Sequence, residues 1–375
     1  MTSLYLHIPF CSSKCFYCSF SSFPGMQEIH DRYVSALLTQ IGGSSSERGE
    51  RVLQTLFVGG GTPTVLRPEK LVEIIQACRN HYTFSEQAEI SIEANPGTVD
   101  RASLEMLREC GVNRLSIGVQ SFNDDDLQVL GRMHCAEKSR QSLEDAREAG
   151  FDNISLDLMY GLPGQGFESW RANLEQAVKL RPQHLSLYQL SIEEGTGFYD
   201  QYRAGRLELP DDEEILGMEQ FTREYLSSHG IQQYEISNYA RPGYECRHNI
   251  GYWENEEFVG CGAGAAGFTG GRRYKLITDP LRYCLAMERG ENVVEGDEIL
   301  DTEASFRETV VMGLRLLRGV DKKRLFERFG LTLDGQYGSI LTELVGRGLL
   351  EENRDFLRLS ARGRRFANQV MAELV

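Results

Sequence analysis

The feature that most constrains the fold is an alternation of short apolar strands with helical stretches over residues 1–190. This order favours a parallel sheet whose crossover helices lie outside it, so we expect an α/β fold. Helical periodicity is clear over 33–41 and 71–78, and the second of these follows Pro68, which suits a first helical position. Six strands are predicted, over residues 4–8, 55–58, 89–93, 114–120, 154–158 and 185–190.

The two faces of this predicted sheet differ in kind, because successive side chains of a strand point to opposite sides. The side chains on one face are apolar throughout, as a sheet face that packs against helices requires. The other carries Tyr5, His7, Ser91, Glu93, Ser116, Gly118, Gln120, Ser155, Asp157, Ser186 and Tyr188. A complete barrel of this class fills its interior with branched aliphatic side chains. We therefore expect an incomplete (β/α)6 barrel, with room for a polar ligand at the carboxyl ends of its strands.

Three residues on the polar face lie at the carboxyl ends of predicted strands: Glu93, Gln120 and Asp157. Each alone is equally consistent with an ordinary polar residue at the start of a loop. Because all three lie on the same face of the predicted sheet, a common site is favoured.

The pattern changes twice after residue 190. Residues 191–300 are acidic, glycine-rich and aromatic, with one helix predicted over 212–228. Residues 301–375 predict helices followed by two short strands, the order of a winged-helix-like α+β module. We expect a barrel (1–190), a family-specific extension (191–300) and this C-terminal module (301–375). The run 42–46, Gly-Gly-Ser-Ser-Ser, predicts a flexible loop.

Charge and cysteine usage limit the partners. The net charge of -15 repels phosphate backbones and anionic lipid surfaces, so we expect no nucleic-acid partner. The C-terminal module has 13 basic and 11 acidic residues, too even a balance for a DNA-reading domain.

No apolar run is long enough for a membrane span and the N-terminus lacks a signal-peptide core, which predicts a cytoplasmic protein. Nine cysteines in a reducing compartment then indicate metal or redox chemistry.

Cys11, Cys15 and Cys18 form a C-x3-C-x2-C pattern directly after the first strand. Structural zinc needs four closed ligands, for which His7 could supply the fourth. An iron–sulfur cluster held by three cysteines instead keeps one iron open to a ligand. The spacing favours the cluster.

The cysteine pattern after the first strand of a parallel barrel resembles the radical S-adenosylmethionine superfamily. That resemblance implies a [4Fe-4S] cluster on the three cysteines, with S-adenosylmethionine chelating the fourth iron and able to yield a 5'-deoxyadenosyl radical. The turn Gly59-Gly60-Gly61-Thr62-Pro63 follows the second strand. By itself it favours a tight structural turn, and beside the cysteine loop it resembles the superfamily's site for the methionine amino group.

Further motifs resemble the coproporphyrinogen dehydrogenase group and its relatives, the HemW heme chaperones. They lie at 5–10, at 118–121 (Gly-Val-Gln-Ser) and at 157–165 (Asp-Leu-Met-Tyr-Gly-Leu-Pro-Gly-Gln). The resemblance assigns Tyr5, Gly60 and Glu93 to the cluster-bound adenosylmethionine. It assigns a second adenosylmethionine position to Gly61, Thr62, Gln120, Arg132 and Asp157.

Two departures separate the branches of this group. The dehydrogenase has a fourth cysteine where this chain has Phe20, and an N-terminal extension where only four residues precede Tyr5. Both favour the heme chaperones over an oxygen-independent coproporphyrinogen III dehydrogenase. The radical machinery would then serve a carrier more than a catalyst.

The segment His248-Asn249-Ile250-Gly251-Tyr252-Trp253 is similar to a pattern of the chaperone branch. A histidine can ligate heme iron, and Tyr and Trp offer flat apolar surface, so the resemblance implies heme binding by His248, Tyr252 and Trp253. A buried, hydrogen-bonded histidine is the other interpretation of His248. The implied partners are heme as cargo, heme-acceptor proteins such as respiratory proteins near the membrane, and an electron donor for the cluster. Cys246 and Cys261 have no assigned role.

Overall fold

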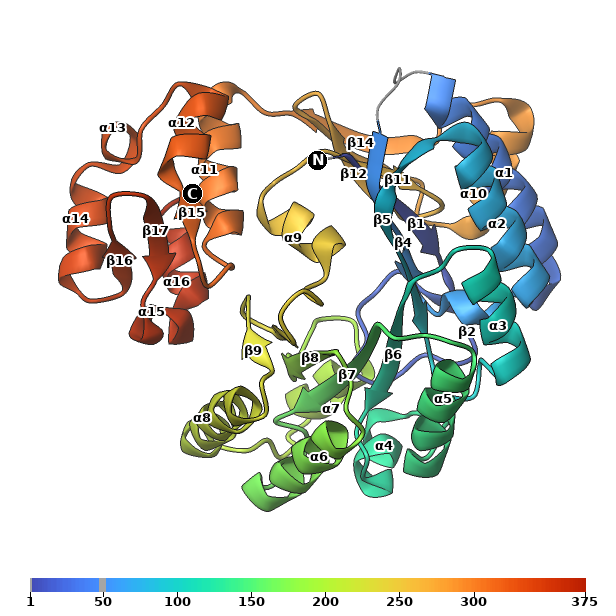
Figure 1. The fold of residues 1–375 in the computed structure, drawn as a ribbon, viewed down its shortest axis with the longest axis horizontal. Helices are drawn as coiled ribbons and strands as arrows, with labels where there is room; N and C mark the ends of the chain where they lie inside the picture. Colours follow the sequence, from blue (N-terminus) through green and yellow to red (C-terminus); the bar gives the residue numbers. More distant parts are fainter. Residues whose placement is uncertain (1, 47–51) are drawn as a thin grey trace.

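The structure, a computed structural model, describes residues 2–46 and 52–375. Its centre is a curved sheet of parallel strands in the order β1-β4-β5-β6-β7-β8 (Figure 1). These strands are β1 (Thr2–Ile8), β4 (Val52–Gly60), β5 (Thr83–Ala94), β6 (Arg114–Gln120), β7 (Ile154–Tyr160) and β8 (His184–Gln189). The predicted incomplete six-stranded barrel is confirmed.

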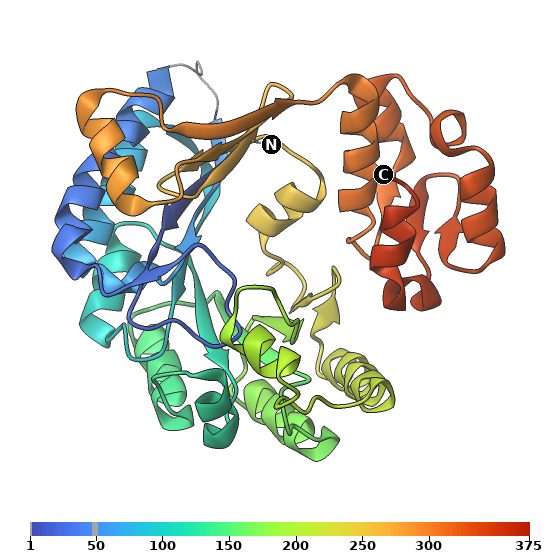
Figure 2. The same ribbon diagram turned by 180° about the vertical axis from the view of Figure 1, so that it is seen from behind.

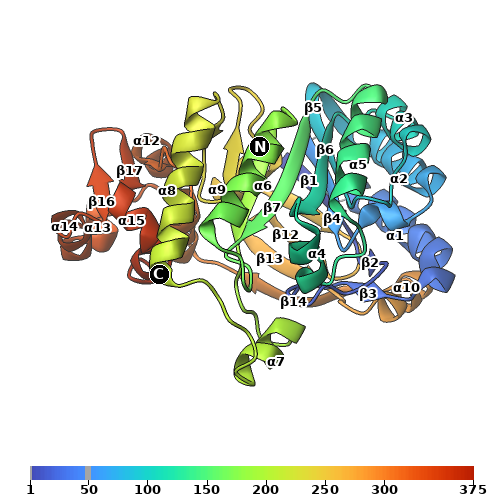
Figure 3. The same ribbon diagram turned by 90° about the horizontal axis from the view of Figure 1, so that it is seen from below.

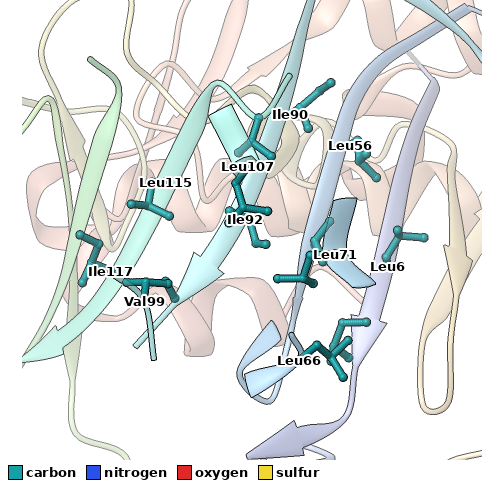
Figure 4. Packing of buried hydrophobic residues seen from close by; sticks show 14 of the residues in the cluster. Leu6, Leu56, Leu66, Leu71, Ile90, Ile92, Val99, Leu107, Leu115 and Ile117 are labelled. Atoms are coloured by element: carbon teal, nitrogen blue, oxygen red, sulfur yellow. The ribbon is translucent and has the colours of Figure 1, made fainter. Parts of the chain in front are cut away.

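Helices cover the convex face of this sheet (Figures 1 and 2). They are α1 (His30–Ser46), α2 (Pro68–His81), α3 (Arg101–Glu109), α4 (Asp124–Leu130), α5 (Ala136–Glu148) and α6 (Phe167–Lys179). The apolar side chains of the strands pack against these helices, and Figure 4 shows Leu6, Ile92 and Leu115 beside Leu71 and Leu107. Each such fully buried side chain stabilises the fold by about 1.5–3 kcal/mol relative to exposure.

The loop predicted over 42–46 is wrong, because α1 continues to Ser46. A Cβ at Gly42 would lie 3.4 Å from the ring of His81, so the small residue lets α1 approach α2 closely. The Ser44 hydroxyl also donates to the carbonyl of Gln40 at 2.7 Å. Packing between helices here overrides the weak helix propensity of Gly and Ser.

Strands from residues 191–300 extend the same sheet at both edges. At one edge β10 (Asn238–Ala240) pairs antiparallel with β8, and β9 (Gln232–Gln233) lies outside it. At the other, β11 (Phe258–Cys261) pairs parallel with β1, followed by β12 (Ala266–Thr269), β13 (Arg272–Leu276) and β14 (Val294–Ile299). The helices are α7 (Gly197–Arg203), which projects from the barrel (Figure 3), α8 (Asp212–Ser228), α9 (Arg247–Trp253) and α10 (Pro280–Arg289). The domain boundary at 190 stays a prediction.

The C-terminal module has its own apolar core, formed by residues such as Phe306, Leu341 and Leu357. Its helices are α11 (Thr302–Gly313), α12 (Lys322–Phe329), α13 (Leu333–Tyr337), α14 (Ser339–Gly346), α15 (Ala361–Arg365) and α16 (Ala367–Ala372). Its small sheet has the order β15 (Val320–Asp321), β17 (Phe356–Leu359) and β16 (Leu350–Glu352). The module lies across α9 from the barrel (Figures 1 and 2). Within the described residues, no helix combines the length and apolar character needed to cross a bilayer.

Candidate functional site

A cavity of about 370 Å³ opens at the carboxyl ends of the barrel strands. This volume lies within the range of small-molecule sites. The cavity brings together residues from the cysteine loop, the glycine turn, the strands β5, β6 and β7, and the turn after α4: Cys11, Cys15, Cys18, Gly60, Gly61, Thr62, Glu93, Gln120, Arg132 and Asp157. Tyr5 lies outside this lining, where its hydroxyl hydrogen-bonds Nδ1 of His7 at 2.9 Å.

The cysteine loop runs between β1 and α1 and is held at both its base and its middle. Its base is the parallel pair β2 (Phe10–Cys11) and β3 (Phe23–Pro24). In its middle, the Phe16 amide donates to the Leu130 carbonyl at 3.1 Å, and the Phe16 carbonyl accepts from the Phe198 amide at 2.8 Å. The loop that presents the thiols is therefore fixed by α4 and by α7.

The three thiols fit a cluster site. Cys11, Cys15 and Cys18 are half-buried and form no disulfide. A guanidinium nitrogen of Arg132 lies 3.6 Å from Sγ of Cys15. Burial raises the pKa of the Cys18 thiol, which metal binding must overcome. Among the described residues, no three or more His, Cys, Asp or Glu side chains enclose a site for a single metal ion.

The glycine turn after β4 packs directly against the cysteine loop. The Gly61 amide donates to the Ile8 carbonyl at 2.9 Å, and the Thr62 amide to the Phe10 carbonyl at 2.7 Å. A Cβ at Gly61 would lie 2.5 Å from that Phe10 oxygen, and Gly60 has φ +118°. Only glycine allows this approach, so the turn brings backbone polar groups to the cysteine loop.

Two carboxyl groups face the cavity from neighbouring parts of the sheet. Burial, and secondarily repulsion by Asp157, raises the pKa of Glu93 to about 8, although Glu93 accepts from the Gly60 amide at 3.1 Å. Burial also raises the pKa of Asp157, which accepts from the hydroxyls of Ser116 at 3.1 Å and Ser155 at 3.3 Å. Such a pair favours a ligand that carries positive charge or hydroxyl donors, as a sulfonium nucleoside does.

Arg132 supplies the opposite charge at this wall. Its guanidinium donates to Oδ1 of Asn95 at 2.7 Å and to the Gly118 carbonyl at 2.6 Å. Asn95 in turn donates to the hydroxyl of Thr62 at 2.8 Å. Because these oxygen partners of Arg132 are neutral, its charge is suited to a ligand carboxylate.

Gln120 is held in the left-handed region at φ +66°, which is rare for residues other than glycine. The Ser121 amide closes this tight turn on the Val119 carbonyl at 2.9 Å. Backbone strain of this kind persists where the surroundings over-determine it and gathers at functional sites.

The cavity wall also contains residues outside the predicted set, among them Asn95, His134 and Tyr188. Tyr188 belongs to the polar face of the sheet that the sequence predicts, and Asn95 lies two residues beyond Glu93. No pattern marks His134, which follows α4 and bonds the Val119 carbonyl at 3.1 Å. Burial, together with the charge of Arg132, lowers the pKa of His134 to about 4.

Helix α9 places His248 inside the barrel, away from this cavity. The side chain is 1% exposed and stacks on Phe57 with ring centroids 5.1 Å apart. Its Nδ1 lies 2.7 Å from the Thr55 hydroxyl and its Nε2 lies 2.8 Å from the Tyr252 hydroxyl. Both nitrogens are therefore occupied, and heme ligation by His248 would require these bonds to break.

Trp253 lies on the other side of α9 and faces the C-terminal module. It lines a separate cavity of about 130 Å³, and the guanidinium of Arg315 lies 4.3 Å from its ring centroid. His248 and Tyr252 contact each other, but Trp253 does not share their surface. The role of these three residues in heme binding stays a prediction.

Comparisons with known proteins agree with this geometry. A sequence model of the radical SAM superfamily matches residues 5–177, and one of the HemN C-terminal domain matches 300–366. The heme chaperone HemW of Bacillus subtilis is 40% identical over 99% of this chain and 98% of its own length. HemW of Escherichia coli is 36% identical over 98% and 97%.

A solved structure agrees over the whole chain. The Escherichia coli coproporphyrinogen III oxidase HemN, a radical SAM enzyme, superposes with a TM-score of 0.87 at 26% identity and covers 100% of this chain and 89% of its own. The radical SAM family implies a [4Fe-4S] cluster and S-adenosylmethionine, for which the barrel cavity has fitting residues. The chain belongs to the radical SAM superfamily and, within it, to the HemW family of heme chaperones.

Proposed function

We propose that this protein binds heme and transfers it to acceptor proteins, and that its barrel cavity holds a [4Fe-4S] cluster and S-adenosylmethionine. The observation that carries the proposal is similarity from end to end to curated heme chaperones, such as 40% identity over 99% of the chain. The proposed partners also include an electron donor for the cluster and acceptors among respiratory proteins near the membrane.

The cavity residues have distinct proposed roles. The thiolates of Cys11, Cys15 and Cys18 would hold the cluster, and its open iron with adenosylmethionine supplies one-electron chemistry when both are bound. Gly60 and Glu93 would hold the ligand nearest the cluster. Further adenosylmethionine contacts would come from Gly61, Thr62, Gln120, Arg132 and Asp157.

Tyr5 would act indirectly on this site. Its hydroxyl bonds His7, whose Nε2 lies 2.9 Å from the Ser21 carbonyl in the cysteine loop. We therefore propose that Tyr5 positions His7 and, through it, the loop that carries the cluster thiols.

The second candidate is an oxygen-independent coproporphyrinogen III dehydrogenase. The close structural similarity to HemN, with a TM-score of 0.87, favours it. Phe20, in place of the fourth cysteine of that enzyme group, disfavours it.

The proposal is tested by titrating heme anaerobically into the cluster-reconstituted protein and following the Soret absorbance. We expect a saturable endpoint near one heme per chain. Chain variants in which the three cluster cysteines are replaced by Ala show whether the cluster is needed for binding. An absence of saturable binding, with turnover of coproporphyrinogen III in the presence of S-adenosylmethionine, would establish the second candidate instead.

A further inference from the structure

Three large apolar side chains at the exposed edge of the barrel cavity, which we call its mouth, remain open to solvent. Phe20 is 68% exposed, Met133 81% and Tyr188 42%, and all three line the cavity. They come from separate segments: the cysteine loop, the turn after α4 and the end of β8. Single exposed apolar residues are common, but their convergence at the opening of a ligand cavity indicates a surface that takes an apolar ligand.

We infer that heme docks across this mouth, with Phe20 and Tyr188 against the porphyrin and the sulfur of Met133 as an axial ligand of the iron. The inference rests on the proposed function, because heme is the cargo proposed there. Aromatic rings pack on flat π-systems, and methionine thioethers ligate heme iron in proteins. The flexible, unbranched side chain of Met133 can adjust to an iron above the cavity.

The charge at the mouth also complements heme. Lys14 lines the same cavity, and its Nζ donates to the Phe20 carbonyl at 2.6 Å and to the Ser22 hydroxyl at 3.0 Å. These bonds hold an ammonium group at the backbone of Phe20, the residue whose ring is exposed at the mouth. Heme is apolar on its two faces and acidic at the edge that carries its propionates, so an apolar surface bordered by a cation matches it.

The cavity floor and the mouth are suited to different ligands. The floor carries the polar groups of Glu93, Asp157 and Arg132, which are only partly exposed and fit adenosylmethionine. The exposed part of the lining carries Phe20, Met133 and Tyr188 together with polar residues such as Lys14 and Glu193. A planar macrocycle lying across the mouth would leave the floor to its own ligand. Docking here breaks none of the hydrogen bonds that occupy His248, in contrast to ligation by that residue.

The test is the heme titration of the full chain, repeated on single variants. Phe20→Ser and Tyr188→Ser remove apolar surface from two different segments, and each should raise the Kd for heme at least about tenfold, or about 1.4 kcal/mol. Met133→Leu keeps apolar volume but removes the sulfur, so it should shift the Soret maximum of bound heme. Phe326→Ser is the matched control, since Phe326 is 54% exposed on α12, far along the chain in the C-terminal module.

Two further results complete the design. His248→Gln should leave both the Kd and the Soret maximum unchanged. Unaltered heme binding by the Phe20, Tyr188 and Met133 variants would overturn the inference while leaving the proposed function intact, as would weakened binding by His248→Gln alone. If the unaltered chain shows no saturable binding, the proposed function itself fails. Because Phe20 is close to Cys18, the Tyr188 variant decides the matter if Phe20→Ser loses its cluster.

Discussion

Acidification should release α9 from the barrel, because His248 is buried in its neutral form. Burial, and secondarily the charge of Arg114, lowers the pKa of His248 from 6.5 to about 3. When α9 opens, the imidazole regains water and its ordinary pKa. Between these two values the open state binds more protons than the docked state, so the free energy of opening falls as the pH falls below 6.5.

The size of the effect follows from the width of this window. Each pH unit within it changes the opening free energy by about 1.4 kcal/mol. Between about pH 7 and about pH 5, docked α9 should lose about 2 kcal/mol, or roughly a 30-fold increase in its open population. The Thr55 and Tyr252 hydrogen bonds are lost together with the burial of the ring.

Hydrogen exchange measured by mass spectrometry on residues 246–254 checks this, after correction for intrinsic exchange rates. His184 is also buried with a lowered pKa, so the comparison with His248→Gln isolates the contribution of His248. We expect a steep pH dependence in the unaltered chain and a flatter one in the variant. Equal slopes in the two proteins would refute the assignment of a neutral, buried His248.

Three other predictions concern the barrel cavity. Replacing Cys11, Cys15 and Cys18 by Ala should abolish the charge-transfer absorbance of a reconstituted cluster, and its survival would exclude these ligands. Glu93 has its pKa raised from 4.5 to about 8, so the native state binds the extra proton and stability should fall as pH rises through that window. As the pH rises from about 5 to about 9, urea midpoints should therefore show Glu93→Gln gaining stability relative to the unaltered chain. A difference that does not change with pH would contradict this. Gly61→Ala forces a Cβ to 2.5 Å from the Phe10 carbonyl, and should cost about 1–3 kcal/mol by thermal melting and reduce iron content. A variant as stable and as iron-loaded as the parent would show that the turn adjusts freely.

Much of the barrel could be predicted because strand and helix patterns are local. Backbone geometry makes successive side chains of a strand point to opposite faces, so the positions of Glu93, Gln120 and Asp157 along their strands already place them on one face. The cysteine spacing is equally local, and the cavity contains all three thiols. The order of the C-terminal helices and strands likewise follows from short-range periodicity and turn residues.

Contacts between distant segments could not be predicted in this way. Helical packing against His81 carries α1 through Gly42, and two-residue strands such as β9 join the sheet only through their neighbours. His134 reaches the cavity wall without any pattern in the chain.

Residue type and spacing over a few positions are enough to establish the barrel class, the polar inner face and the loop of cluster thiols. Contacts between distant segments decide which of these side chains are enclosed by partners and which remain exposed. His248 is enclosed by Thr55 and Tyr252, Tyr5 is turned toward His7, and Phe20 and Met133 remain in water. The physical reason is that a side chain's hydrogen bonds and exposure are set by neighbours from other strands and helices, which no local pattern specifies.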